Sequence, residues 1–123
     1  MQPVNQRPFD NDIPMTPISQ PDPEIFELLE DLWRRHLPTT RERLDLLQEA
    51  VDMAVAGTLN DEKRNEAQTV AHKLSGNLGM FGYKEAGEIA CEIEHLFKTL
   101  VPSATRELSM YMQRLQAALA DHI

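Results

Sequence analysis

Cysteine, glycine and long apolar runs are all scarce in this sequence, and each shortage excludes a class of protein. A single cysteine among 123 residues cannot form an internal disulfide, so the fold must depend on a hydrophobic core. No apolar run approaches the roughly 18 residues that a membrane-spanning helix requires. The first residues also lack the basic and then apolar order of a secretory signal. We therefore expect a cytoplasmic protein with no membrane partner.

Positive charge is in short supply as well. Twelve Lys and Arg stand against 20 Asp and Glu, which gives a formal net charge of −8. Because nucleic acids are bound through clustered positive charge, we expect no nucleic-acid partner. The five glycines and the many Leu, Glu, Ala and Gln residues favour helices over strands joined by tight turns. A chain of this length and composition predicts one all-α domain.

Prolines concentrate at the start of the chain. Six of the eight lie in the first 23 residues, where they remove amide donors and disfavour a helix at each preceding residue. We interpret residues 1–22 as a proline-rich tail or linker. The folded domain is then expected over residues 23–123.

Apolar residues of the domain recur at intervals of three and four, the spacing of one helix face. The first helix is expected to end near Leu37-Pro38, and Thr39 with Glu42 forms a capping pattern for the next. Short connections make consecutive helices antiparallel, so we expect an up-down four-helix bundle with an additional N-terminal helix. The third helix can be capped by Asn60 or Thr58 and is expected to run to about Phe81. The other four predicted helices cover about residues 23–37, 39–56 and 86–100 and a stretch after Pro102-Ser103 that reaches about Leu119.

His72 is predicted to point away from the core. A helix turns about 100° per residue, which places His72 roughly 150° from the apolar stripe of its helix. Gly76 and Gly79 follow four and seven residues later, on the same side. A glycine inside a helix costs about 1 kcal/mol relative to alanine, so two of them indicate the close approach of another molecule. The alternatives are that they let a second helix of the bundle pack tightly, or that the helix ends near Gly76.

Acidic residues are missing around His72. Residues 67–84 contain no Asp or Glu, although 20 acids in 123 residues would place about three in a stretch of 18. Such a surface suits a site that repeatedly holds a dianionic phosphoryl group. An exposed neutral imidazole is a sufficient nucleophile for that group, because a partner can supply the metal ion and the electrostatic stabilisation. We therefore expect no cofactor and no metal site in this chain.

The stretch from Ala71 to Gly82, AHKLSGNLGMFG, resembles the signature of histidine phosphotransfer domains. That signature is a helical histidine followed by Leu two residues on, Gly four on, a small residue seven on and Gly ten on. The specific match covers about residues 68–97. The four positions after the histidine are filled in turn by Leu74, Gly76, Gly79 and Gly82.

The resemblance implies that His72 accepts a phosphoryl group from the aspartate of one receiver domain and passes it to another. The chain would then be a phosphocarrier without kinase activity of its own. Its partners would be response-regulator receiver domains and a hybrid sensor kinase, with magnesium bound by the receiver. Residues expected to lie near the phosphate or to contact the receiver are Gln68, Lys73, Ser75, Gly76, Gly79 and Lys84.

Two details of the resemblance concern neighbours of His72. Many family members carry a lysine where this chain has Ser75, and the missing lysine would weaken electrostatic stabilisation of the phosphohistidine. The family also orients the histidine ring through a polar side chain of the next helix. Glu88 and Lys84 are the candidates for that role.

Two other classes of function stay open at this stage. A helical adaptor could dock receiver domains without carrying phosphate, which Ser75 favours and His72 disfavours. A hydrolase or metal enzyme is disfavoured because paired Glu-x-x-His ligands are missing. The remaining histidines, at 36, 95 and 122, show no metal-ligand spacing, and we interpret them as ordinary surface or helix-end residues. A self-contained bundle needs no partner to bury its core, so we expect a monomer.

Overall fold

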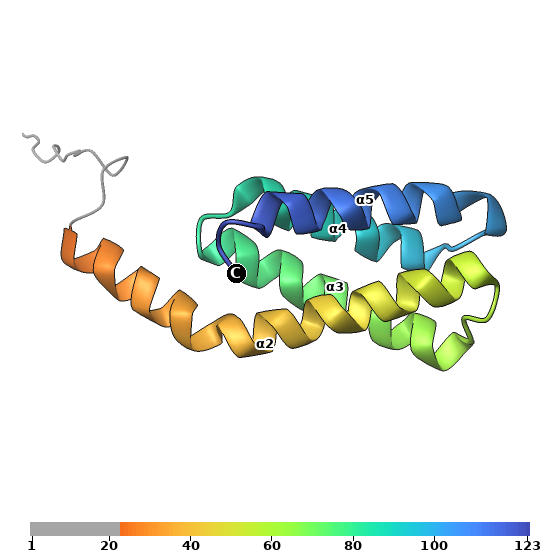
Figure 1. Cartoon of the computed structure of the whole chain (residues 1–123), viewed down its shortest axis with the longest axis horizontal. Helices are drawn as coiled ribbons and strands as arrows, with labels where there is room; N and C mark the ends of the chain where they lie inside the picture. The colour runs from red at the N-terminus through yellow and green to blue at the C-terminus, as the bar shows by residue number, and fades with distance from the viewer. Residues whose placement is uncertain (1–22) are drawn as a thin grey trace, which may run out of the picture. The chain divides into compact units, whose positions relative to one another are not determined.

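The computed structural model describes residues 23–123 and leaves the predicted tail, residues 1–22, outside the described part. Its elements are all helical, and no strand occurs between residues 23 and 123 (Figure 1). The prediction of an all-α domain is therefore confirmed. The elements are α2 (Pro23–Ala56), α3 (Asp61–Met80), α4 (Lys84–Lys98), the 3-10 turn η2 (Pro102–Ala104) and α5 (Thr105–Leu119).

One helix stands where the sequence predicts two. α2 continues through Pro38, so the expected break at Leu37-Pro38 is wrong, and the predicted additional N-terminal helix is the first part of α2. Proline removes one amide donor and crowds the carbonyl four residues before it, but the other hydrogen bonds of the helix can still form. Thr39, the expected N-cap, is consequently an interior residue of α2.

The chain divides into two units, one ending at Arg34 and the other beginning at Arg35. The described part of the first unit is the beginning of α2. There Ile25, Phe26 and Leu28 are each more than half exposed, whereas Trp33 is buried. The second unit holds the main core and His72.

The core of the second unit is built from the predicted apolar stripes. Val55 is an exception at 60% exposure, and Phe81 and Leu100 are only partly buried. All three lie at or just beyond a helix end, where the apolar face runs out. The buried stripe residues include Leu44, Leu47, Val51, Ala67, Val70, Leu74, Leu78, Ala86, Ile89, Ile93, Phe97, Leu108, Met112, Leu115 and Leu119.

Short turns reverse the chain between helices. Of the two caps that the sequence offers for α3, Asn60 and Thr58, Asn60 is the one used: its side-chain oxygen accepts a hydrogen bond from the Lys63 amide at 2.8 Å. Gly82 adopts a φ of 91° in the turn between α3 and α4, a conformation that a side chain disfavours. α3 packs against α4 and α4 against α5, and in Figure 1 these neighbours run in opposite directions. The turn at Gly82 thereby places α4 beside the helix that carries His72.

Leu78 provides a test of the core. Its side chain is fully buried, so Leu78→Ala should lower the free energy of unfolding by about 2–5 kcal/mol through lost burial and the cavity left behind. Val55→Ala, at the exposed end of α2, should change it by less than about 0.5 kcal/mol. Urea titration followed by circular dichroism measures both. Equal losses at the two positions would contradict this placement of the core.

Candidate functional site

His72 projects from the middle of α3 into solvent. Its side chain is 73% exposed, while Ala71 and Leu74 on either side of it are buried in the core. The prediction that this histidine faces away from the core is confirmed. A helix anchored on both sides of the residue thus presents the imidazole at a fixed place on the surface.

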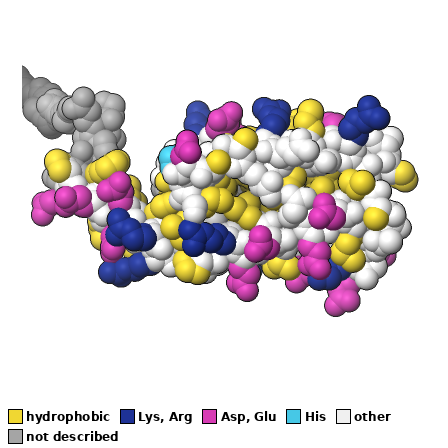
Figure 2. All heavy atoms as spheres, in the orientation of Figure 1, with side chains coloured by type: hydrophobic (Ala, Val, Ile, Leu, Met, Phe, Trp, Pro, Cys, Tyr) yellow, Lys and Arg dark blue, Asp and Glu magenta, His cyan; other side chains and the backbone are white. Residues whose placement is uncertain are grey.

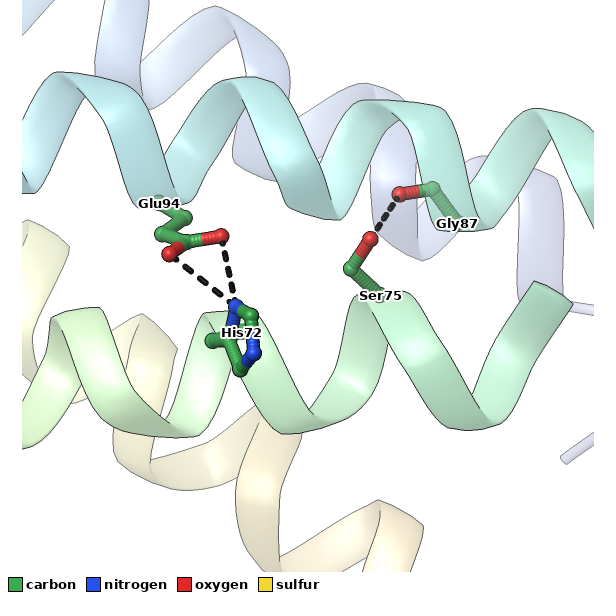
Figure 3. A network of polar contacts seen from close by, with 4 residues as sticks. All are labelled: His72, Ser75, Gly87 and Glu94. Carbon is green, nitrogen blue, oxygen red and sulfur yellow. Dashed lines mark hydrogen bonds and ion pairs between the residues drawn. The ribbon is translucent and has the colours of Figure 1, made fainter.

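Glu94 of α4 holds the imidazole ring. The Nδ1 atom of His72 lies 3.1 Å from Oε2 and 3.2 Å from Oε1 of Glu94 (Figure 3). An ionised carboxylate can only accept hydrogen bonds, so Nδ1 carries the proton and donates it to Glu94. In the neutral ring the lone pair then lies on Nε2, at the opposite edge of the imidazole. Nε2 is therefore the ring atom whose lone pair is free to act as a nucleophile or a base.

The orienting residue is not one of the two candidates proposed from the sequence, Glu88 and Lys84. Residues at similar distances from the turn of an antiparallel helix pair face one another. Gly82 is ten residues after His72 and twelve before Glu94, whereas Glu88 is only six residues beyond Gly82. Counting from the turn would therefore have placed the partner of His72 near Glu94 from sequence alone.

Carboxylates are not wholly excluded from the site. The acid-free stretch 67–84 forms most of α3 and the turn after it, but α4 supplies Glu94, whose side chain is 19% exposed. On the face drawn in Figure 2, acidic side chains instead gather where Figure 1 places the second half of α2 and the start of α3. The exposed acids of these segments are Glu42, Asp45, Glu49, Asp52, Asp61, Glu62 and Glu66. Glu94 is tolerated beside His72 because it meets the N–H edge of the ring.

Ser75 lies one turn beyond His72 and takes part in the contact between helices. Its hydroxyl donates a hydrogen bond to the Gly87 carbonyl oxygen at 3.0 Å (Figure 3). The side chain is part-buried at the interface of α3 and α4. The Ser75 hydroxyl therefore links α3 to α4.

Gly76 and Gly79 leave open space beneath His72. Both are exposed, and a Cβ atom built at either position would meet nothing within 4 Å. α3 also continues past Gly76 to Met80. Both alternative interpretations of these glycines are therefore wrong. No second helix occupies the space that a side chain at Gly76 or Gly79 would fill, and the helix does not end at Gly76. They leave bare backbone on the side where His72 projects.

The other predicted site residues lie at the edge of this surface. Gln68 and Thr69 line a shallow depression together with His72 and Glu94. Lys73 and Lys84 are exposed, and within residues 23–123 neither forms a hydrogen bond or ion pair with His72. The charged neighbour that the described structure gives the ring is Glu94.

The other histidines are separate from this site. His36 is half-buried, and its Nε2 accepts a hydrogen bond from the Asn77 amide at 3.3 Å, so it is not the ordinary surface residue expected. His122 packs against the Tyr83 ring. No group of three or more His, Cys, Asp or Glu side chains in the described part of the chain is arranged to hold a metal ion.

Two comparisons with known proteins give matches, one to a family and one to a relative. The family model described as Hpt domain matches residues 24–122. Protein RcaC of Microchaete diplosiphon is 30% identical over 93 residues, which make up 75% of this chain and 14% of RcaC. No solved structure gives a significant match. The chain belongs to the Hpt domain family.

Membership defines the class of activity. Hpt domains are phosphocarriers rather than kinases, and they act with receiver domains in the phosphorelays of two-component signalling. The role of this chain is therefore of the phosphorelay type. Among residues 23–123, no helix combines the length and the hydrophobicity needed to cross a lipid bilayer.

Proposed function

We propose that the chain accepts a phosphoryl group on Nε2 of His72 from a receiver aspartate and donates it to a second receiver. The observation that carries this proposal is the hydrogen bond from Nδ1 to Glu94, 3.1 Å long, on a ring that is 73% exposed. It fixes the tautomer and leaves Nε2 accessible. A hybrid sensor kinase would be the source of the phosphoryl group on the first receiver.

In the accepting step, the Nε2 lone pair attacks the phosphorus of the aspartyl phosphate. The N–P bond forms as the P–O bond to the aspartate breaks, and that electron pair returns to the aspartate carboxylate. The ring, still protonated at Nδ1, gains positive charge, which the Glu94 carboxylate stabilises through its hydrogen bond. Donation reverses these steps: the second aspartate attacks, the N–P bond breaks, and its electrons return to Nε2.

The receiver is proposed to supply what this chain lacks for the transfer. Phosphoryl transfer depends on positioning and on positive charge around the phosphate oxygens, which magnesium bound by the receiver would provide. Gln68, Lys73 and Lys84 are proposed to lie at the edge of the docked receiver. Gly76 and Gly79 would lie beneath it, where their missing side chains leave room.

The helix arrangement, the oligomeric state and the cellular compartment are also part of the proposed function. Residues 35–56 with α3, α4 and α5 are proposed to form the up-down four-helix bundle of the domain, which would occupy residues 23–123. The short turns and the continuous core support this arrangement. We further propose that it works as a cytoplasmic monomer and not on nucleic acid, in keeping with its charge of −8.

The function is tested by a pulse and chase of labelled phosphate. Purified chain is mixed with a receiver carrying labelled aspartyl phosphate, and a second receiver with magnesium is then added. Label should move to the chain, resist alkali, be lost in acid, and leave when the second receiver arrives. If receivers bind but no label moves, the adaptor alternative, which Ser75 favours, replaces the phosphocarrier.

Gly76 gives a prediction about docking. Gly76→Phe fills the open space beside His72 and should slow transfer from the receiver at least about tenfold, the effect of about 1.4 kcal/mol lost from docking. Folding should be unaffected, since nothing lies within 4 Å of the new Cβ. Gln113→Phe places the same aromatic side chain on the exposed face of α5, away from His72, and is the control. Equal transfer rates in the two variants would contradict docking over Gly76.

A further inference from the structure

α3 and α4 meet backbone to backbone at Gly87. This glycine is buried, and a Cβ atom at its position would lie 3.1 Å from the carbonyl oxygen of Ser75 and 3.3 Å from the amide nitrogen of Gly79. Both neighbours are backbone atoms, so no rotation of a side chain could relieve the contact. A Cβ atom at Gly87 therefore requires the backbone of α3 to give way by a few tenths of an ångström.

Ser75 joins α3 to α4 at the same place through a hydrogen bond. Its hydroxyl donates to the Gly87 carbonyl oxygen at 3.0 Å, and its own carbonyl oxygen is the atom that a Cβ at Gly87 would approach most closely. Gly76 and Gly79 differ, because a Cβ atom at either would meet nothing. Of these three helix glycines, Gly87 is the one whose missing side chain the helix packing requires.

The contact between Ser75 and Gly87 is close to His72 and Glu94. Ser75 is one turn beyond His72 on α3, and Gly87 is seven residues, or two turns, before Glu94 on the same face of α4 (Figure 3). The distances from Nδ1 to the two oxygens of Glu94, 3.1 and 3.2 Å, are at the upper end of the hydrogen-bond range. A small widening at the crossing would lengthen them beyond it.

We propose that Gly87 and Ser75 are positioning residues, which set the spacing of α3 and α4 so that Glu94 holds the proton on Nδ1 of His72. Gly87 allows the backbones of α3 and α4 to approach closely because it has no side chain, and Ser75 holds the two helices at that distance through its hydrogen bond. The inference deepens the proposed function, because the tautomer so selected is the one that exposes the Nε2 lone pair for phosphoryl transfer.

The tautomer can be measured on the free chain. Nitrogen-15 chemical shifts of the His72 ring report the ratio of the Nδ1–H to the Nε2–H form. In Gly87→Ala we expect that ratio to fall about fivefold, equivalent to about 1 kcal/mol of lost hydrogen-bond energy. Gly76→Ala, which also adds one methyl group inside a helix, should leave the ratio unchanged. Ser75→Ala, which removes a bond and adds no atom, should lower it by a smaller factor.

A double-mutant cycle separates positioning from general loosening of the fold. If Gly87 acts through Glu94, Gly87→Ala should have no further effect on the tautomer in a Glu94→Ala background. An unchanged ratio in Gly87→Ala alone, or an undiminished effect without Glu94, overturns the inference. Neither measurement uses phosphate or a receiver, so a result that overturns the positioning role of Gly87 and Ser75 would not contradict the phosphocarrier function. A lack of label transfer in the pulse and chase would contradict the phosphocarrier function and would not bear on the positioning role.

Discussion

His72→Gln is expected to take up no phosphoryl group from any receiver. The lone pair of an amide nitrogen is delocalised into the carbonyl, so glutamine offers no nucleophile in place of Nε2. Because the His72 side chain is 73% exposed, the substitution should change the free energy of unfolding by less than about 0.5 kcal/mol. Loss of uptake would then reflect lost chemistry and not lost folding.

The measurement is transfer of labelled phosphate from a receiver, with His95→Gln as the matched control. His95 is also exposed, on α4, and should be replaceable without effect. Receiver binding by His72→Gln, followed by calorimetry, should persist, since the glycines beneath the ring are untouched. Label that persists on His72→Gln would show that another residue is the acceptor.

Glu94→Ala is expected to slow transfer about ten- to a hundredfold without abolishing it, because a hydrogen bond to a charged group is worth about 1.5–3 kcal/mol. The variant loses both the acceptor that keeps the proton on Nδ1 and the negative charge that stabilises the phosphorylated ring. Glu94→Gln keeps an acceptor oxygen without the charge and should lie between the natural chain and the alanine variant.

Single-turnover rates with a saturating receiver measure this effect on the chemical step. Glu88→Ala is the control, since Glu88 is an exposed residue of α4 that the ring does not contact. A rate in Glu94→Ala equal to that of the natural chain would contradict the role given to Glu94. A rate lowered equally in Glu88→Ala would point to the general charge of α4 rather than to one hydrogen bond.

The helix that carries His72 and the turn after it can largely be predicted from short stretches of sequence. The apolar stripe of α3, the Asn60 cap and the turn at Gly82 each depend on residues within a few positions of one another. For that reason the exposure of His72 could be predicted without a structure. The helix break at Pro38 could not be settled in this way. Proline disfavours the helix that precedes it, yet a long helix can absorb one missing hydrogen bond, and neighbouring contacts decide the outcome.

The site itself depends on contacts between helices, which the sequence specifies less directly. Glu94 is not among the residues predicted from the sequence, although its distance from the turn at Gly82 indicates it. The use of Ser75 and Gly87 at the helix crossing could not be predicted, because it depends on the distance between two backbones. The sequence also leaves open whether Gly76 allows another helix of the bundle to pack closely or leaves a free surface. The structure answers this question, because no atom of another helix lies within 4 Å of a Cβ built at Gly76.

The central claim, that Glu94 holds Nδ1 and leaves Nε2 to carry the phosphoryl group, is tested most directly by nuclear magnetic resonance of the phosphorylated chain. Protein labelled with nitrogen-15 in its histidine rings is phosphorylated by a receiver, and coupling between phosphorus and ring nitrogen is recorded. The account predicts coupling to Nε2 of His72 and to no other histidine nitrogen. Coupling to Nδ1 of His72, or to a nitrogen of another histidine, would contradict it.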